Sequence, residues 1–180
     1  MRGGTRAHVI AGLIGGLAGS FAMEHFQRAL GRISPDSGGA PGGGGQQYRK
    51  PQSEPATYKA ADVVASATAG HPVPPAYKPA AGALVHYAFG GTVGAIYGAA
   101  TAQDRDVAAG AGIPFGIAVW VAADELGMPL VGLAKAPTAY PLKDHASAFA
   151  AHLVFGATTE AVRRLMLAAL APRRGVYRRG

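Results

Sequence analysis

The stretch AGLIGGLAGSFAME, residues 11–24, decides how this chain folds, because it is written a second time as AGIPFGIAVWVAAD, residues 111–124, 100 positions further on. Several small residues recur at the same places in both copies, and apolar residues fill most positions between them. Each copy ends on a carboxylate, Glu24 in the first and Asp124 in the second. Two matching apolar segments predict two matching helices, each with an acidic residue near one end.

A second motif is also doubled, as HYAFGGTVGAI at 86–96 and HLVFGATTEAV at 152–162, with an offset of 66 positions. Each copy begins on a histidine, His86 or His152. The two doubled motifs predict a duplicated two-helix unit. A twofold rotation about the membrane normal would superpose the copies, as in membrane folds built from parallel repeats. That rotation would make the two histidines face each other, and likewise the two carboxylates.

The composition favours a membrane protein. Of 180 residues, 49% are hydrophobic and only 15% are charged, which is unusual for a soluble protein. Four apolar segments have about the 20 residues that a bilayer core requires, and they cover residues 8–28, 82–102, 107–127 and 146–168. We therefore expect an all-α fold, an integral membrane four-helix bundle made of two tandem transmembrane hairpin repeats.

The basic residues lie at the ends of the apolar segments. The net charge of +7 would suggest nucleic-acid binding only if it covered one solvated face, and no recognition motif accompanies it. Arginines precede the first segment and end or follow the last: Arg2, Arg6, Arg163, Arg164, Arg173, Arg174, Arg178 and Arg179. This distribution is typical of cytoplasmic flanks, so both termini are expected in the cytoplasm. Because the chain has no cysteine, disulfides and thiolate metal sites are excluded.

The connectors differ in length and composition. Residues 29–81 form a Gly- and Pro-rich connector that should be flexible and external, with a short surface helix at 57–69. A second external connector is expected at 128–145. Residues 169–180 are expected to form a basic cytoplasmic tail.

Glycines four residues apart form stripes along the predicted helices. Small residues at this spacing let membrane helices approach closely, so the stripes predict helix contacts within this chain or with a second copy or membrane partner. The glycines expected to pack in this way are Gly12, Gly16, Gly90, Gly94, Gly98, Gly112, Gly116 and Gly156.

Four ionisable residues continue these stripes at one depth in the outer half of the predicted bundle. They are Glu24, His86, Asp124 and His152, and we expect them to form one functional cluster. Three further residues, His25, Glu125 and His145, should lie close to the same level. Glu160 should lie about two turns deeper than His152.

Several chemistries suit two histidines and two carboxylates inside a bundle. They could relay protons, because histidine titrates near neutrality. They could bind a divalent transition metal, with Glu24, His86, Asp124 and His152 as ligands. A haem between the two histidines is disfavoured, because two carboxylates would be an unusual surrounding for it. They could also only hydrogen-bond one another and hold the helices together. No nucleophile motif supports hydrolase chemistry, so the expected role is not enzymatic.

The last predicted helix resembles that of the YagU family of bacterial inner-membrane proteins. The resemblance rests on HLVF at 152–155, Glu160 and the Arg163–Arg164 pair, on PLVGL at 129–133, on His86 with Phe89, and on the region from Gly94 to Tyr97. It extends from about residue 82 to 168, with a weaker match around 12–21. It implies a multi-pass inner-membrane protein associated with acid tolerance, and it assigns no catalytic residue.

The expected function is a proton- or cation-linked activity of a multi-pass inner-membrane protein, in the setting of acid or envelope stress. The alternative from a different class is a structural or partner-subunit membrane protein whose polar residues only hold helices together. The sequence predicts the lipid bilayer as a partner and leaves a second copy or another membrane protein open.

Overall fold

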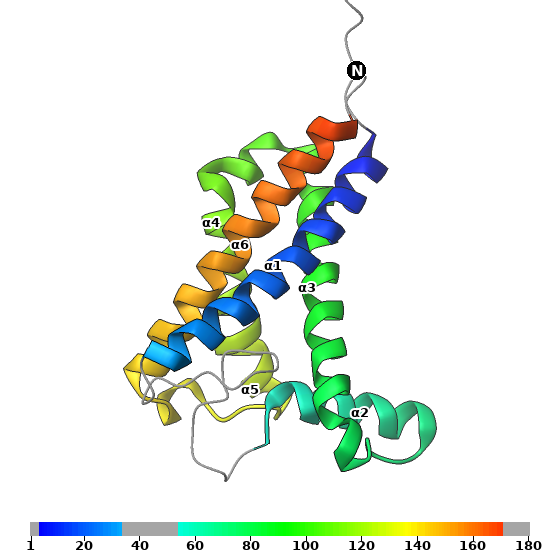
Figure 1. Ribbon diagram of the computed structural model, residues 1–180, viewed down its shortest axis with the longest axis vertical. Coiled ribbons are helices and arrows are strands. Elements are labelled where there is room, and N and C mark those ends of the chain that lie inside the picture. The colour runs from blue at the N-terminus through cyan, green and yellow to red at the C-terminus, as the bar shows by residue number, and fades with distance from the viewer. Residues whose placement is uncertain (1–3, 34–53, 171–180) are drawn as a thin grey trace, which may run out of the picture.

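A computed structural model describes residues 4–33 and 54–170, and Figure 1 shows its arrangement. The expected glycine-rich run of the first connector and nearly all of the expected basic tail lie outside these ranges. In the described part of the chain every regular element is a helix and no strand occurs. The all-α class is therefore confirmed.

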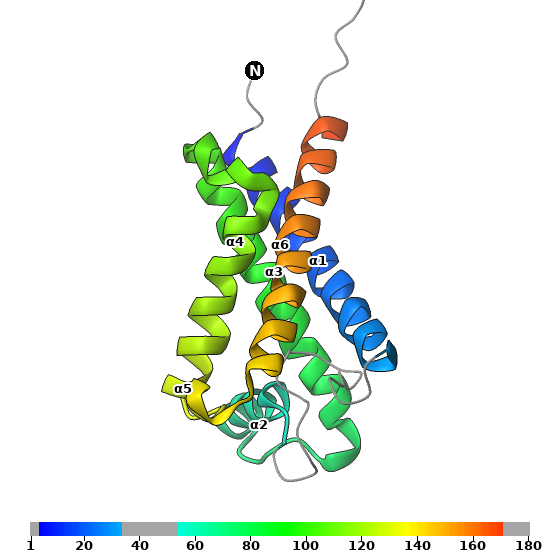
Figure 2. The same ribbon diagram turned by 90° about the vertical axis from the view of Figure 1, so that its left-hand side faces the viewer.

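Four long helical stretches run between the same two ends of the molecule (Figures 1 and 2). They are α1 (Thr5–Ile33), α3 (Lys78–Gln103), α6 (Leu142–Leu170), and the continuous run of α4 (Ile113–Val119), the π-helical η4 (Trp120–Gly127) and α5 (Met128–Leu130). The shorter elements are α2 (Ala56–Ala69) and the 3-10 turns η2 (Pro75–Tyr77), η3 (Arg105–Gly112) and η5 (Pro137–Ala139).

The third stretch begins later than the expected residue 107. Gly110, Ala111 and Gly112 all have positive φ angles, of 72°, 53° and 84°, which break the chain between η3 and α4. Pro114 then lies in the first turn of α4, where its missing N–H costs nothing. Pro114 therefore starts this helix and does not kink its interior. The second copy of the first motif opens in a turn, whereas the first copy is helical throughout.

Glycines bring the long helices into backbone contact. α1 runs antiparallel to both α3 and α6 and packs against each of them, and α4 packs antiparallel against α6. A Cβ atom added at any of the eight glycines would meet the facing helix, at its backbone or, for Gly90, at the hydroxyl of Ser20. These contacts are only possible because glycine has no side chain.

The two antiparallel contacts differ in register by one helical turn. In the first contact, Gly12 packs on Gly94. The residue 66 positions after Gly94 is Glu160, so an exact repeat would place Gly112 on Glu160. Gly112 instead packs on Gly156, one turn earlier in α6. The helix pairs α1–α3 and α4–α6 are therefore similar without being exact copies of one another.

Polar side chains fill much of the interior, and large apolar side chains cover the outside. The largest fully buried side chains are Glu160, Thr159 and Ser20. Large hydrophobic residues are exposed along all four long stretches, among them Ile10, Leu13, Leu17, Phe21, Leu84, Phe89, Ile96, Ile117, Val121, Leu126 and Leu165.

Two helical stretches of the described chain are long and apolar enough to cross a membrane, Thr5–Ile33 and Arg105–Leu130. The sequence predicted four. α3 and α6 fall short by this measure. Both helices are less hydrophobic because they contain many glycine and polar residues. Among these are His86 in α3 and His152 and Glu160 in α6.

The helix α2 lies across the end of the molecule at which α1 ends, at the bottom of Figure 1. It packs against α3, and Lys59 Nζ donates a hydrogen bond of 3.2 Å to the carbonyl of Leu133. Lys78 at the start of α3 pairs with Asp62 of α2 at 2.7 Å. Val63 and Val64 remain exposed on the outer surface of α2.

Candidate functional site

A cavity lies between the long helices, near the end that α2 covers. It offers a volume of about 80 Å³ to water-sized molecules. Its wall takes residues from α1, α2, α3, α6 and the α4–η4–α5 run, and most of them are apolar. The polar side chains that line it are Ser20, Thr57, His86, Asp124 and His152.

Three of the four residues predicted as one cluster line this cavity. His152 lies in α6 and is buried, and its Nδ1 atom lies 3.8 Å from Oδ2 of Asp124 in η4. The same Nδ1 atom lies 2.8 Å from the carbonyl oxygen of Ala148. A carbonyl only accepts, so Nδ1 of His152 carries the hydrogen and Nε2 keeps the lone pair in the neutral ring.

His86 faces the cavity from α3. Its Nε2 atom donates a long hydrogen bond of 3.4 Å to the carbonyl of Ser20 in α1, so Nδ1 keeps the lone pair of the neutral ring. The Ser20 side chain is fully buried, and its hydroxyl has no hydrogen-bond partner among the described residues. Ser20 was not expected in the site, although it occupies the stripe position between Gly16 and Glu24.

Glu24 does not line the cavity. Tyr87 donates its hydroxyl to Oε2 of Glu24 at 2.7 Å, and Arg28 donates to Oε1 at 2.5 Å. The carboxylate still interacts electrostatically with His86. The expected pairing of Glu24 with Asp124 is therefore replaced by a local network. Tyr87 could not be recognised from the sequence, since its counterpart in the second repeat is Leu153.

The described residues include no group of three or more His, Asp or Glu side chains disposed to hold a metal ion. The arrangement therefore does not offer the four-ligand metal site that the sequence made conceivable. Imidazole and carboxylate groups around a small cavity can instead bind water and exchange protons.

The residues expected near the same level form separate local contacts. His25 lies on the outside of α1, where Nδ1 donates to the carbonyl of Phe21 at 2.9 Å. His145 pairs with Glu125, with 2.7 Å between Nδ1 and Oε1, and its Nε2 atom lies 3.0 Å from the carbonyl of Pro137. Both ring nitrogens of His145 face acceptors, which favours the doubly protonated imidazolium.

The Glu125–His145 contact predicts a pH-dependent stability. The hydrogen bond to Glu125 is the main cause that raises the pKa of His145 above its ordinary value of 6.5. A raised pKa means that this contribution is fully present below about pH 6.5 and is lost as the pH rises through the raised value. Glu125→Gln should therefore lower the melting temperature more at about pH 6 than at about pH 9.

The exposed residue His71 supplies the control for this measurement, since it lies in the loop after α2. His71→Gln should change the melting temperature little at either pH. A Glu125→Gln effect that stays constant or grows toward high pH would show that the pair does not act through a charged His145.

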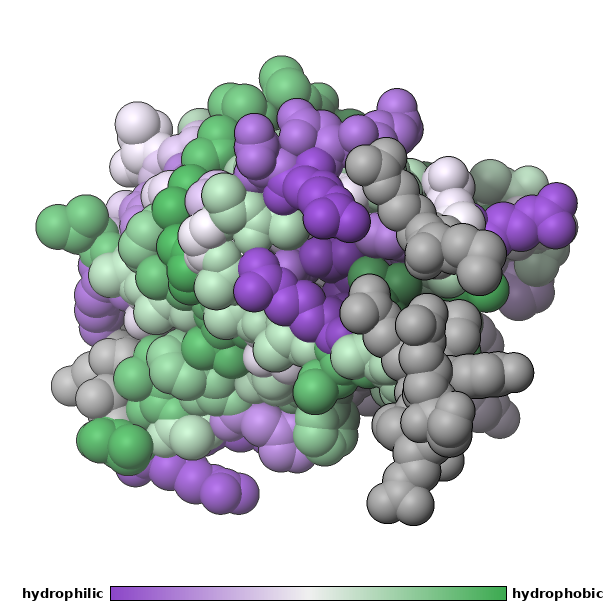
Figure 3. Space-filling view, turned by 90° about the horizontal axis from the view of Figure 1, so that it is seen from above, coloured by the Kyte–Doolittle hydropathy of each residue, from purple (hydrophilic) through white to green (hydrophobic). Residues whose placement is uncertain are grey.

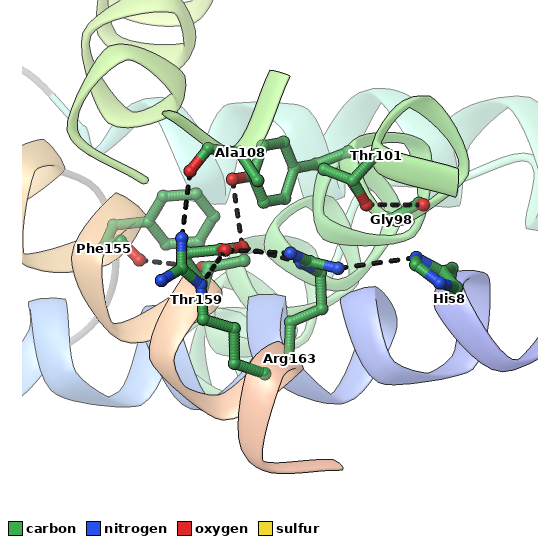
Figure 4. Close-up of polar contacts among 10 residues, drawn as sticks. His8, Gly98, Thr101, Ala108, Phe155, Thr159 and Arg163 are labelled. Atoms are coloured by element: carbon green, nitrogen blue, oxygen red, sulfur yellow. Dashed lines mark hydrogen bonds and ion pairs between the residues drawn. The ribbon is translucent and has the colours of Figure 1, made fainter. Parts of the chain in front are cut away.

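A second polar network lies toward the opposite end of α6, around the buried Glu160 (Figure 4). The carboxylate accepts hydrogen bonds from Tyr97 Oη at 3.0 Å and from Arg163 Nε and Nη2 at 2.6 and 2.8 Å. Arg164 also donates to it through Nε. The expected depth of Glu160, away from His152, agrees with this separate location.

This network connects four elements of the fold. Arg163 reaches from α6 toward His8 of α1, with 3.4 Å between Nη1 and Nδ1, and Arg164 donates to the carbonyl of Ala108 in η3 at 3.1 Å. Tyr97 belongs to α3. Hydrophilic side chains gather at this end of the molecule, flanked by hydrophobic ones (Figure 3). His8 is partly buried beside the guanidinium group of Arg163.

The chain was compared with protein families, curated proteins and solved structures. No curated protein and no solved structure matches it. One family model, described as protein of unknown function (DUF1440), matches residues 72–161. The match covers half of the chain, includes His86, Asp124, His152 and Glu160, and is consistent with the resemblance to the YagU family. The chain therefore belongs to the DUF1440 family.

Proposed function

We propose that this chain is a multi-pass protein of the bacterial inner membrane, with four transmembrane helices arranged as two tandem hairpins and both termini in the cytoplasm. The distribution of side chains supports the membrane location. Its largest fully buried side chains are polar, while leucine, isoleucine and phenylalanine side chains face outward. In lipid this arrangement is favourable, because the outer surface meets hydrocarbon and the charged groups around Glu24 and Glu160 are paired inside.

We further infer that the cavity carries a proton- or small-cation-linked activity, in the setting of acid or envelope stress. The observation that carries this inference is that His86, Asp124 and His152, from three separate elements, line one cavity between the helices. Ionisable groups inside a membrane are costly to keep there and mark ion or proton pathways. The histidines change charge near neutral pH, so they suit a pathway for protons.

The test replaces His86 and His152 with glutamine, separately, in protein reconstituted into liposomes. Glutamine retains an amide donor but does not titrate. We expect pH-dependent flux to fall at least about ten-fold in each variant, the effect of losing a proton-transferring group. The melting temperature in detergent is expected to change little.

His25→Gln is the matched control, because His25 contacts Phe21 of its own helix and is not part of the cavity lining. Its flux should equal that of the unmodified protein. Unchanged flux in both cavity variants, together with lowered melting temperatures, would contradict the proposed activity.

A structural or partner-subunit role is the second candidate. It is favoured by the two carboxylates outside the cavity, Glu24 and Glu160, whose hydrogen bonds join α1 to α3 and α6 to α3. In this role the polar groups hold helices together, and the exposed apolar faces would bind lipid, a second copy or another membrane protein.

A further inference from the structure

We propose that the species handled by the cavity is the proton, carried by water molecules that the Ser20 hydroxyl anchors between His86 and the His152–Asp124 pair. This inference rests on the proposed function and narrows it from protons or cations to protons alone. Ser20 is a positioning residue in this scheme, and the two imidazoles exchange the proton.

The size and walls of the cavity favour water over a dehydrated cation. A volume of about 80 Å³ holds several waters, since a cavity needs roughly 10–15 Å³ to hold one. Hard cations take about six or more oxygen ligands when they lose their hydration shell. Within residues 4–33 and 54–170, the lining side chains that offer oxygen atoms are those of Ser20, Thr57 and Asp124. The remaining wall includes Met23, Val119 and Phe155, which have none to offer.

The Ser20 hydroxyl identifies where the water binds. Its residue is fully buried, its Oγ has no partner among the described residues, and it lies against Gly90 on the cavity wall. A buried hydroxyl without a partner is unfavourable, and a bound water satisfies it as well as a protein group does. Alanine would fill nearly the same space, so packing alone does not require the hydroxyl.

The histidine nitrogens complete the path. The neutral rings direct Nε2–H of His86 to Ser20 and Nδ1–H of His152 to Ala148, which leaves one lone pair on each ring. Asp124 lies 3.8 Å from Nδ1 of His152, beyond hydrogen-bond length, so a direct bond does not connect the pair. Asp124 therefore acts on this ring through its charge.

The proton transfer breaks and forms only N–H and O–H bonds. A proton from outside adds to the free nitrogen of His86 and gives an imidazolium. This ring returns to its neutral form by giving one proton to a cavity water, which in turn protonates Nε2 of His152. One positive charge has then moved from α3 to α6, and Asp124 stabilises it there.

Charged and polar groups of α1, α2 and η4 surround this path. Glu24 of α1, which Arg28 and Tyr87 hold, acts electrostatically on His86, and Glu125 of η4 acts on Asp124. Asp124 is the carboxylate that η4 contributes to the lining, and α2 contributes Thr57 to it.

The experiment compares Ser20→Ala with the unmodified protein in liposomes that contain a pH-sensitive dye, at equal membrane potential. We expect proton flux to fall about five-fold, the factor that corresponds to one lost hydrogen bond. The ratio of the rates in H₂O and D₂O should also change, whereas a purely structural loss would leave this ratio unaltered. Ser66→Ala, at an exposed position of α2, is the matched control and should change neither quantity.

The same vesicles are then tested with sodium, potassium and zinc ions under a fixed pH. The inference predicts no cation flux that depends on His86. It is overturned if His86→Gln abolishes a sodium, potassium or zinc flux, or if Ser20→Ala matches the unmodified protein while His86→Gln slows proton flux. In both cases the proposed activity stands. If His86→Gln changes no flux at all, the proposed activity itself fails, and the inference fails with it.

Discussion

Glu160→Gln is expected to lower the free energy of unfolding by about 3–5 kcal/mol, the usual effect of removing one partner from a buried ion pair. Glu160 is the only acidic partner that the hydrogen bonds of Arg163 reach among the described residues, and both residues are buried. A neutral amide leaves the guanidinium charge of Arg163 uncompensated inside the protein. Glutamine has nearly the same volume as glutamate, so the effect reports charge and hydrogen bonding.

The measurement is chemical or thermal unfolding in detergent, with Glu54→Gln as the control. Glu54 also pairs with a basic residue, Lys78, but this pair is exposed and should contribute about 1 kcal/mol or less. Arg164→Gln should lower the free energy of unfolding by an amount between those of Glu160→Gln and Glu54→Gln, because the Arg164 side chain is 58% exposed. An unfolding free energy for Glu160→Gln that equals the Glu54→Gln value would show that the buried network does not hold α6 to α3 and η3.

Gly16→Val is expected to destabilise the protein by about 3 kcal/mol or more, at the upper end of the range for overpacked interiors. A Cβ at position 16 would collide with the backbone of Gly90, and a backbone cannot move aside as a side chain can. Valine would therefore separate α1 from α3. The separation would also disturb the cavity, since Ser20 lies one turn further along α1 and His86 one turn before Gly90.

Gly91→Ala provides the control for this substitution, because it adds a Cβ to the same pair of helices. The nearest atom to that Cβ is the side chain of Leu17 at 3.2 Å, which can shift. We expect the free energy of unfolding of this variant to lie within about 1 kcal/mol of that of the unmodified protein. If Gly16→Val unfolded at the same denaturant concentration as Gly91→Ala, the close contact of α1 and α3 would be refuted.

The glycine stripes carried most of the packing information in the sequence. Spacing of four residues places such glycines on one helical face, so the pattern identified which faces meet. It did not identify partners or register. Gly112 packs on Gly156, one turn from the position that the repeat implied, and the positive φ angles at 110–112 explain why the third helix begins late.

The candidate site was predicted in part. Helical spacing and depth brought His86, His152 and Asp124 to one level, and these three residues line the cavity. Depth does not determine the direction in which a side chain turns, and Glu24 turns to Tyr87. Ser20 belonged to a recognised stripe, but only its surroundings show that its hydroxyl lacks a partner.

The sequence by itself determined that the fold is helical and which glycine faces pack, and it showed that one doubled motif carries a carboxylate in each copy and the other a histidine. Only the tertiary structure decided that the long helices enclose a cavity. Gly15 and Gly19 let α1 pack closely on α6, whereas the matching residues of the second copy are Phe115 and Val119. Phe115 stacks on Tyr97 at 4.2 Å, so α4 meets α3 through aromatic rings and not through backbone contact. Large side chains there keep these two helices apart, and the space beside Val119 becomes part of the cavity into which His86 and Asp124 project.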